Sequence, residues 1–253
     1  MVEERFAAVF EKTLPPTARA IRSFAPDLCL NLHGGTRSAR LTLLSGAATR
    51  AGFDIFKPGW IYNEPIPTAQ EILGLDRRVH TAEHQASAMF YLGVPVAEVP
   101  RASLPAIPGK TALAPKTAYA VIHPMASAPQ KTWPAAFFLQ LARFLRQSVG
   151  LEPLFIGGPG EDLSQFQMFQ TLIGAPLPDL ARLLRDAAVF IGNDSGPAHV
   201  AAAFGTPQVV FFGSSDEEIW RPWRTSHQIL KGEPIHTITV NSAIGAFRRL
   251  GLS

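Results

Sequence analysis

Cysteine is almost absent from this sequence: Cys29 is the only one among 253 residues. A single cysteine can form no disulfide within the chain, and it cannot build a metal site from several thiolates. Cys29 stands inside the apolar run DLCLNL at 27–32, a setting typical of a buried core thiol. Disulfide-stapled folds and cysteine-rich metal clusters are therefore excluded.

Long hydrophobic runs are absent too. No stretch approaches the roughly 20 apolar residues that a membrane-spanning helix needs, and the N-terminal stretch MVEERFAAVFEK carries acids where a signal peptide would be apolar. The excess of positive charge is small, with 23 Lys and Arg against 20 Asp and Glu, and it does not indicate nucleic-acid binding. We expect a cytoplasmic protein that binds no nucleic acid and at most touches a membrane surface.

The sequence is rich in apolar residues, which make up 47% of it and form short runs. Runs that predict strands lie at 28–32, 50–53, 119–124, 153–158, 188–193 and 208–213. Most of these runs are continuous rather than alternating, as in parallel strands covered on both faces. Amphipathic segments at 135–150 and 177–187 predict helices between the strands. This alternation predicts an α/β fold with parallel sheets.

A proline-rich stretch at 95–118 has no helical or strand periodicity and is typical of a linker between domains. The predicted division is an N-terminal domain at 1–100, a linker at 101–118, a second domain at 119–240 and a closing helix at 241–253.

The stretch IGNDSGPAHVAAAFGTPQVVFFG at 191–213 predicts a strand, a helix and another strand. Asp194 or Ser195 is suited to cap the helix, which then begins at the carboxyl end of a parallel strand, where open α/β sheets bind ligands. The free N–H groups and positive dipole end of such a helix attract anions, and Gly196 lets a phosphate approach the backbone. A purely structural role, with capping residues and a packed His199, explains this stretch equally well.

Two further loops add to this pattern. The loop HPMASAPQKTWP at 123–134 offers Ser127 and Lys131, and the loop GGPGED at 157–162 offers two glycines and Glu161. Neither loop is a dinucleotide fingerprint or a P-loop. Lysine neutralises phosphate charge, and a carboxylate accepts hydrogen bonds from ribose hydroxyls. Because all three loops follow parallel strands, they predict a site for a nucleoside diphosphate at one edge of a sheet.

At this point the chain resembles the family-9 glycosyltransferases, which include the ADP-heptose:lipopolysaccharide heptosyltransferases. The resemblance is carried by HPMASAPQKTWP, IGGPGED and, above all, NDSGPAHVAAAFGTPQVVFFGSSDEEIWRPW. In the first half it is carried by DLCLNLHGGTRSARLTLLSGAATRAGF and HTAEHQASAMFYLGVP. The resemblance implies a GT-B-like fold, in which two Rossmann-like domains with parallel sheets hold the active site between them.

The resemblance also implies a reaction. It is the inverting, metal-independent transfer of a sugar from a nucleotide donor, ADP-heptose, to a lipopolysaccharide core or lipid A acceptor, with no cofactor and at the inner face of the inner membrane. The implied contacts to the donor diphosphate come from Ser127, Lys131, Ser195, Gly196 and His199. Asp194 and Glu161 are implied beside the donor sugar and nucleoside. His33 and Arg37 either face the acceptor or stabilise a turn.

The sequence departs from the family in its first domain. Family members begin with a strand and a Gly-Asp turn whose aspartate is the expected catalytic base, and no Gly-Asp pair occurs in this chain. We therefore expect an N-terminal domain without its first strand-helix-strand portion, and the catalytic residue stays unassigned. A sheet shortened in this way would expose an edge, which predicts self-association. The alternative function is a non-catalytic family member that only binds a nucleotide or nucleotide-sugar.

Other interpretations of the residues stay open. His80, Glu83 and His84 spell H-x-x-E-H, a zinc-peptidase pattern that also occurs by chance. A scaffold protein with an unused donor pocket and a sugar-nucleotide epimerase are two further alternatives.

Overall fold

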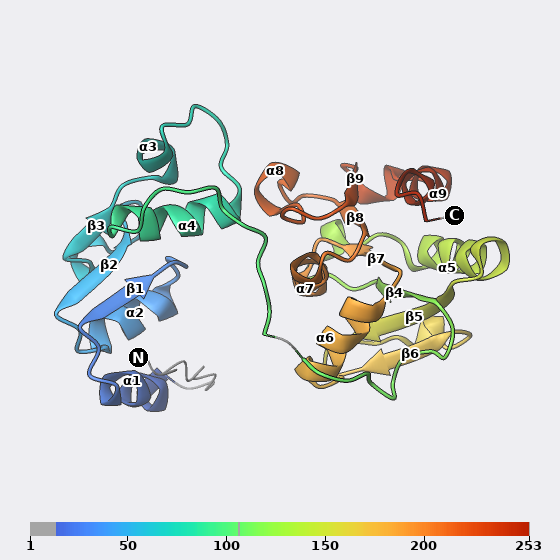
Figure 1. The fold of residues 1–253 in the computed structure, drawn as a ribbon, viewed down its shortest axis with the longest axis horizontal. Coiled ribbons are helices and arrows are strands. Elements are labelled where there is room, and N and C mark those ends of the chain that lie inside the picture. The colour runs from blue at the N-terminus through green and yellow to red at the C-terminus, as the bar shows by residue number, and fades with distance from the viewer. Residues whose placement is uncertain (1–13, 106, 253) are drawn as a thin grey trace. The chain divides into compact units, whose positions relative to one another are not determined.

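Two parallel sheets organise the residues that the computed structural model describes, which are 14–105 and 107–252. The chain divides into two units, Met1–Val99 and Pro100–Ser253, each with one of these sheets (Figure 1). The predicted α/β class with parallel sheets is therefore confirmed. The beginning of the predicted N-terminal domain, residues 1–13, lies outside the described residues. In the described part of the chain, no helix combines the length and the apolar character that a membrane span requires.

The first unit holds the smaller sheet, in the order β1-β2-β3. Its strands are β1 (Leu28–Asn31), β2 (Thr49–Phe53) and β3 (Glu64–Ile66). Its helices are α1 (Leu14–Ser23), α2 (Thr36–Leu44), α3 (Ala69–Leu73) and α4 (Thr81–Tyr91), with a 3-10 turn η1 (Gly59–Ile61). The apolar runs predict β1 and β2 but not β3, because the three residues of β3 include a glutamate and a proline.

The core of the first unit is small. One buried cluster is formed by Ala51 and Phe53 of β2, Ile66 of β3 and Ala88 of α4, and a second by Ala39, Ile61 and Tyr62. The strand β1 lies at an edge of the sheet and is only partly covered. The expectation of a buried Cys29 thiol is therefore wrong, since this edge strand leaves Cys29 half-buried.

The second unit holds six strands in the order β6-β5-β4-β7-β8-β9, all parallel. They are β4 (Tyr119–His123), β5 (Glu152–Gly157), β6 (Gln170–Ile173), β7 (Val189–Asn193), β8 (Gln208–Phe212) and β9 (His227–Lys231). The helices are α5 (Ala135–Phe144), α6 (Leu177–Asp186), α7 (Gly196–Phe204), α8 (Glu217–Trp220) and α9 (Val240–Arg249). Short turns are η2 (Pro129–Lys131), η4 (Ser164–Phe166) and η5 (Ile235–Thr237), and η3 (Leu145–Val149) is a π-helical turn.

Helices cover both faces of this sheet (Figure 1). On one face, Ile122 and Phe211 pack with residues of α5 and α9 such as Phe138 and Phe247. On the other face, the alternate strand residues, such as Val121, pack with residues of α6 and α7. Because successive residues of β4 and β8 point into opposite cores, each central strand is apolar throughout.

The strand order reverses between β4 and β7. The chain runs outward from β4 through β5 to β6 and then returns to β7, from which it runs through β8 to β9. Loops that leave the carboxyl ends of β4 and β7 therefore diverge to opposite sides of the sheet. Such a switch point is where open parallel sheets bind their ligands.

The sequence patterns miss the two edge strands of the second unit. Residues of β6 and β9 are mostly half-exposed, so their sequences mix polar and apolar residues and form no continuous run. The helix predicted at 135–150 is present, but its last turn widens into η3 and ends at Gly150, whose φ is 80°. A glycine adopts this left-handed conformation without steric penalty.

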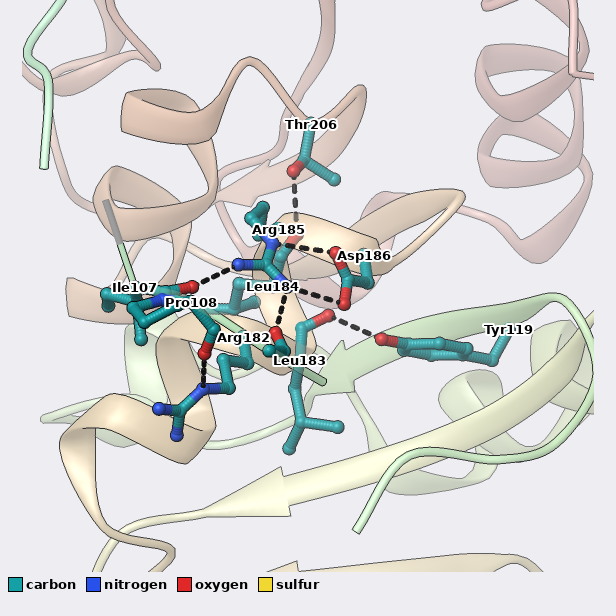
Figure 2. Close-up of polar contacts among 10 residues, drawn as sticks. Ile107, Pro108, Tyr119, Arg182, Leu183, Leu184, Arg185, Asp186 and Thr206 are labelled. Carbon is teal, nitrogen blue, oxygen red and sulfur yellow. Dashed lines mark hydrogen bonds and ion pairs between the residues drawn. The ribbon is translucent and has the colours of Figure 1, made fainter. Parts of the chain in front are cut away.

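The proline-rich stretch after Val99 is attached to the second unit. Arg182 of α6 donates to the carbonyl oxygen of Pro108 at 3.1 Å, and Arg185 donates to the carbonyl oxygens of Ile107 and Gly109. Figure 2 shows both arginine side chains reaching from α6 to this segment. Side-chain donors on a helix thus replace the sheet partners that this irregular backbone lacks.

Candidate functional site

A pocket of about 500 Å³ opens at the switch point of the second unit. It lies at the carboxyl ends of β4, β5 and β7. Most of its lining comes from these strand ends and the segments that follow them, and Leu172 of β6 and Leu180 of α6 line it too. The lining includes His123 at the end of β4 with Ala126 and Ser127 of the loop after it, and residues 157–159 and Glu161 at and after the end of β5. It also includes residues 194–197, where the turn after β7 enters α7. The three loops singled out in the sequence therefore meet in one cavity.

The N-terminus of α7, residues 194–197, forms one wall of this pocket and is called here the mouth of α7. Ser195 occupies the N-cap position in an extended conformation, and Pro197 stands in the first turn. The Ser195 side chain makes no capping hydrogen bond; its Oγ lies 3.0 Å from Nδ1 of His123 instead. The first N–H groups of a helix have no intrahelical acceptor, so this wall presents positive partial charge to an anion.

Gly196 leaves room at the helix mouth. A Cβ atom at this position would meet no other atom within 4 Å, and Gly196 lines the pocket. The space that a side chain would take stays available to a ligand.

The loop after β5 folds back on itself through Glu161. One carboxylate oxygen, Oε2, accepts the N–H of Gly158 at 2.7 Å and lies 3.6 Å from Nε2 of His123. The Glu161 carboxylate is thereby held at the pocket wall while part of it stays exposed, since a third of its side chain is accessible.

His123 is the pocket residue that sequence patterns did not single out. It ends β4, is buried, and contacts both Ser195 and Glu161. Burial lowers the pKa of His123, and the Glu161 carboxylate opposes this shift. The signal in the sequence was a polar residue that ends an apolar strand directly before a loop.

Asn193 is a second polar residue at the end of an apolar strand that the sequence analysis did not single out. It is fully buried at the end of β7, its Nδ2 donates to the carbonyl oxygen of Pro124 at 2.8 Å, and its Oδ1 accepts the N–H of Trp133 at 3.0 Å. The amide therefore fixes both ends of the loop that carries Ser127. Asn193 positions the pocket rather than lining it.

Two of the predicted donor residues do not line this pocket. Lys131 ends η2, four residues after Ser127, and His199 lies in the first turns of α7. The His199 ring stands 6.5 Å from the Trp220 ring, and burial lowers its pKa against the opposing effect of Asp194. The pocket thus brings together Ser127, Glu161 and residues 194–196. Lys131 lies on the segment that carries Ser127, and His199 lies on the helix that begins at Gly196.

His33 and Arg37 belong to the first unit, on the turn after β1. The backbone N–H of His33 donates to Oδ1 of Asn31 at 3.0 Å, and Asn31 also donates to the Tyr62 hydroxyl at 2.8 Å. Both His33 and Arg37 are exposed. The turn is therefore held by Asn31, and the two predicted residues stay accessible to a ligand.

The H-x-x-E-H pattern does not form a zinc site. His80 uses Nδ1 to accept the N–H of Ala82 at the start of α4, Glu83 pairs with Arg77 at 2.6 Å, and His84 stacks on the Phe53 ring. Within residues 14–105 and 107–252, no group of three or more His, Cys, Asp and Glu side chains is placed to hold a metal ion. The three residues are used in capping, pairing and packing.

Comparisons with known proteins show the family and the fold of the chain. The family model for glycosyltransferase family 9 (heptosyltransferase) matches residues 17–242. A curated relative, lipopolysaccharide heptosyltransferase 3 of Escherichia coli, is 37% identical over 116 residues, which are 42% of this chain and 34% of that protein. The aligned stretch thus spans about a third of the curated relatives.

Solved structures share the fold. The family-9 glycosyltransferase of Veillonella parvula superposes with a TM-score of 0.72 at 20% identity and covers 92% of this chain and 77% of its own. The E. coli heptosyltransferase WaaC with ADP superposes with a TM-score of 0.70 at 17% identity and covers 96% of this chain and 80% of its own. The predicted GT-B-like fold, with parallel sheets in two α/β units, is confirmed by these likenesses. Because the family model matches most of its length, the chain belongs to glycosyltransferase family 9, the heptosyltransferase family.

Proposed function

We propose that the pocket of the second unit binds the diphosphate of a nucleotide-sugar and that the protein transfers the sugar to a lipopolysaccharide core acceptor. The donor proposed is ADP-heptose. The observation that carries this proposal is the convergence of a glycine-bearing helix mouth, a second glycine-rich loop and a held carboxylate at one switch point. The heptosyltransferase name of the curated relative, and the likeness to the structure of WaaC with ADP, support the donor.

The proposed chemistry needs the leaving diphosphate to be stabilised as its charge develops. Fixed N–H groups and a cation placed beforehand provide this stabilisation without a metal ion or cofactor. We assign diphosphate contacts to Ser127, Lys131, Ser195, Gly196 and His199, and contacts to the sugar and nucleoside to Asp194 and Glu161. Inversion at the anomeric carbon is part of the same proposal.

The first unit is proposed to receive the acceptor. His33 and Arg37 are exposed on one turn and carry groups that bind phosphate. A lipid A or lipopolysaccharide core acceptor would bring the protein to the inner face of the inner membrane as a peripheral, cytoplasmic protein. The exposed apolar side chains of this unit, such as Leu28 and Trp60, also favour the proposed self-association. In this assignment residues 1–100 form the acceptor side, residues 119–240 the donor side, residues 101–118 the linker and residues 241–253 the closing helix.

A second candidate function is nucleotide or nucleotide-sugar binding without transfer. The observation for it is that the described pocket accounts for donor binding alone, since no residue of the chain is assigned as the base that would deprotonate the acceptor hydroxyl. The same pocket serves both candidates, so donor binding and sugar transfer need separate measurements.

The first test is a thermal-shift panel of ADP, UDP, GDP and CDP on the whole chain. A ligand at 100 times its dissociation constant stabilises the folded state by about 2.7 kcal/mol. A shift with ADP alone is the expected result, and no shift with any nucleotide on folded protein would overturn the donor site. Transfer is then tested with ADP-heptose and lipopolysaccharide stripped of its outer sugars: product supports the transferase, and binding without product supports the second candidate.

A further inference from the structure

The imidazole ring of His123 contacts two walls of the pocket. The side chain of His123 is only 8% exposed, with Nδ1 3.0 Å from Oγ of Ser195 and Nε2 3.6 Å from Oε2 of Glu161. The same Glu161 oxygen accepts the N–H of Gly158. The end of β4, the loop after β5 and the mouth of α7 therefore meet at this ring.

A neutral imidazole has one proton for these two neighbours. If the proton is on Nδ1, the lone pair of Nε2 faces the Glu161 carboxylate, and the two repel each other. If the proton is on Nε2, it faces the carboxylate, and Nδ1 accepts the Ser195 O–H. The second arrangement satisfies both neighbours, but it uses the only hydrogen of the Ser195 hydroxyl.

This arrangement does not suit a phosphate. Phosphate oxygens accept hydrogen bonds, and a hydroxyl whose hydrogen is committed elsewhere offers them only lone pairs. The other titratable side chains that line the pocket are Glu161, from the loop after β5, and Asp194, from the turn before α7. Both are acidic, so the lining side chains in the described residues supply no permanent positive charge. Lys131 and His199, which we assign to the diphosphate, lie outside this lining, so neither supplies the hydrogen that Ser195 lacks.

An imidazolium removes both difficulties. With a proton on each nitrogen, His123 donates to Ser195 Oγ and faces Glu161 with a positive charge. The Ser195 O–H is then free to turn toward a phosphate oxygen. We propose that His123 takes up one proton from solvent when a diphosphate enters the pocket, and that the imidazolium thereby makes Ser195 a hydrogen-bond donor to the phosphate.

This inference rests on the proposed function, since it needs a diphosphate in the pocket. Burial lowers the pKa of His123 while the pocket is empty, so the free protein holds the neutral ring near neutral pH. A bound anion raises the pKa, because negative charge nearby favours the charged form of an imidazole. His123 acts through Ser195 and Glu161 and is a positioning residue.

The probe is ADP-ribose, an ADP-sugar whose two phosphates each carry one charge and do not titrate near neutral pH. Its binding to the whole chain is measured by calorimetry at one pH in buffers of different ionisation enthalpy, which gives the number of protons taken up. We expect the uptake to approach one proton at a pH between the pKa of His123 in the free and in the bound protein, and to be a smaller fraction outside that range. Between the pKa of the free and the bound protein, the dissociation constant should rise by up to about tenfold per pH unit, which is the limit for one linked proton.

Three variants separate the roles of the neighbours. His123→Gln cannot ionise, so the pH dependence of its dissociation constant should fall to the part that His199, the other histidine assigned to the diphosphate, contributes. Near neutral pH its binding should be weaker than that of the unmodified protein. Glu161→Gln removes the counter-charge of the imidazolium and should reduce proton uptake even if His123→Gln fails to fold. His236→Gln, at an exposed histidine of η5, is the control and should keep the full uptake.

The outcomes distinguish this inference from the proposed function. Proton uptake that falls in His123→Gln and is retained in full in His236→Gln supports it. Tight binding of ADP-ribose without proton uptake, or uptake unchanged in both His123→Gln and Glu161→Gln, overturns the role of His123 and leaves the donor site standing. Failure of ADP-ribose and of all nucleotides in the panel to bind overturns both.

Discussion

The two sheets differ in how completely they are covered. The central strands β4, β7 and β8 of the second unit are buried at every residue, whereas β1 of the first unit is buried only at Asn31. The pocket stands on the covered sheet, where strand ends are fixed by packing on both faces. The turn that carries His33 and Arg37 stands on the partly covered sheet. Substitutions should therefore affect stability and donor binding far more in the second unit than in the first.

The largest expected effect is on stability, from a pair of tryptophans. Trp133 is fully buried, stacks on Phe211 and donates from Nε1 to the carbonyl oxygen of Ile238 at 2.8 Å, so Trp133→Ala should lower the free energy of unfolding by about 3–5 kcal/mol. Trp60 is 70% exposed, so Trp60→Ala should change the free energy of unfolding by less than about 0.5 kcal/mol. Urea unfolding followed by circular dichroism measures both, and equal losses would contradict the contrast between the units.

Donor binding gives the next largest effect. Lys131→Ala should weaken ADP binding by about 1.5–3 kcal/mol, because our proposed function assigns Lys131 a charge-assisted hydrogen bond to phosphate. Lys57→Ala, at an exposed lysine of the first unit, is the matched control and should leave the affinity unchanged. Calorimetric titration with ADP decides this: an unchanged affinity in Lys131→Ala would remove Lys131 from the site, and a loss in Lys57→Ala would show that the first unit contributes to donor binding.

The central features of the second unit could be predicted from sequence because they are local. A strand buried on both faces is apolar throughout, and Gly196, Pro197 and Gly205 mark the two ends of α7. What could not be predicted depends on contacts between distant segments. Asn193 and His123 look alike in sequence, as polar residues at strand ends, and only the fold shows that one fixes a loop and the other lines the pocket. The edge strands β6 and β9 were missed because a half-exposed strand has no continuous apolar run.

A change in pH is expected to have a smaller effect on the stability of the folded chain. Burial lowers the pKa of His123 and His199 in the second unit and of His84 in the first. A buried histidine with a lowered pKa binds its proton less well in the folded than in the unfolded chain, so stability is full above the unfolded pKa of about 6.5 and falls as pH drops below it.

For each such site the loss is at most about 1.4 kcal/mol per pH unit. Thermal unfolding without ligand, between about pH 7.5 and 5.5, should show a smaller loss on acidification in the double variant of His123→Gln and His199→Gln than in the unmodified protein. His84→Gln should reduce the loss by less, since it removes one site rather than two. Equal pH dependence in the double variant and the unmodified protein would mean that neither histidine of the second unit resists protonation in the fold.

The smallest expected effect is on the segment at 107–113, near the beginning of the second unit. Arg185 donates to the carbonyl oxygens of Ile107 and Gly109 (Figure 2), and each such hydrogen bond contributes about 0.5–1.5 kcal/mol. Arg185→Ala should therefore speed hydrogen exchange in residues 107–113. ADP affinity should stay unchanged, because Arg185 neither lines the pocket nor belongs to a loop that does. Arg146→Ala, which breaks a surface pair with Glu152, is the control and should leave exchange in this segment unaltered.

Unchanged exchange in Arg185→Ala would mean that other contacts attach the segment to the second unit. Faster exchange in this segment together with weaker ADP binding would mean that the contacts of Arg185 also hold α6 in place at the pocket, which α6 lines through Leu180.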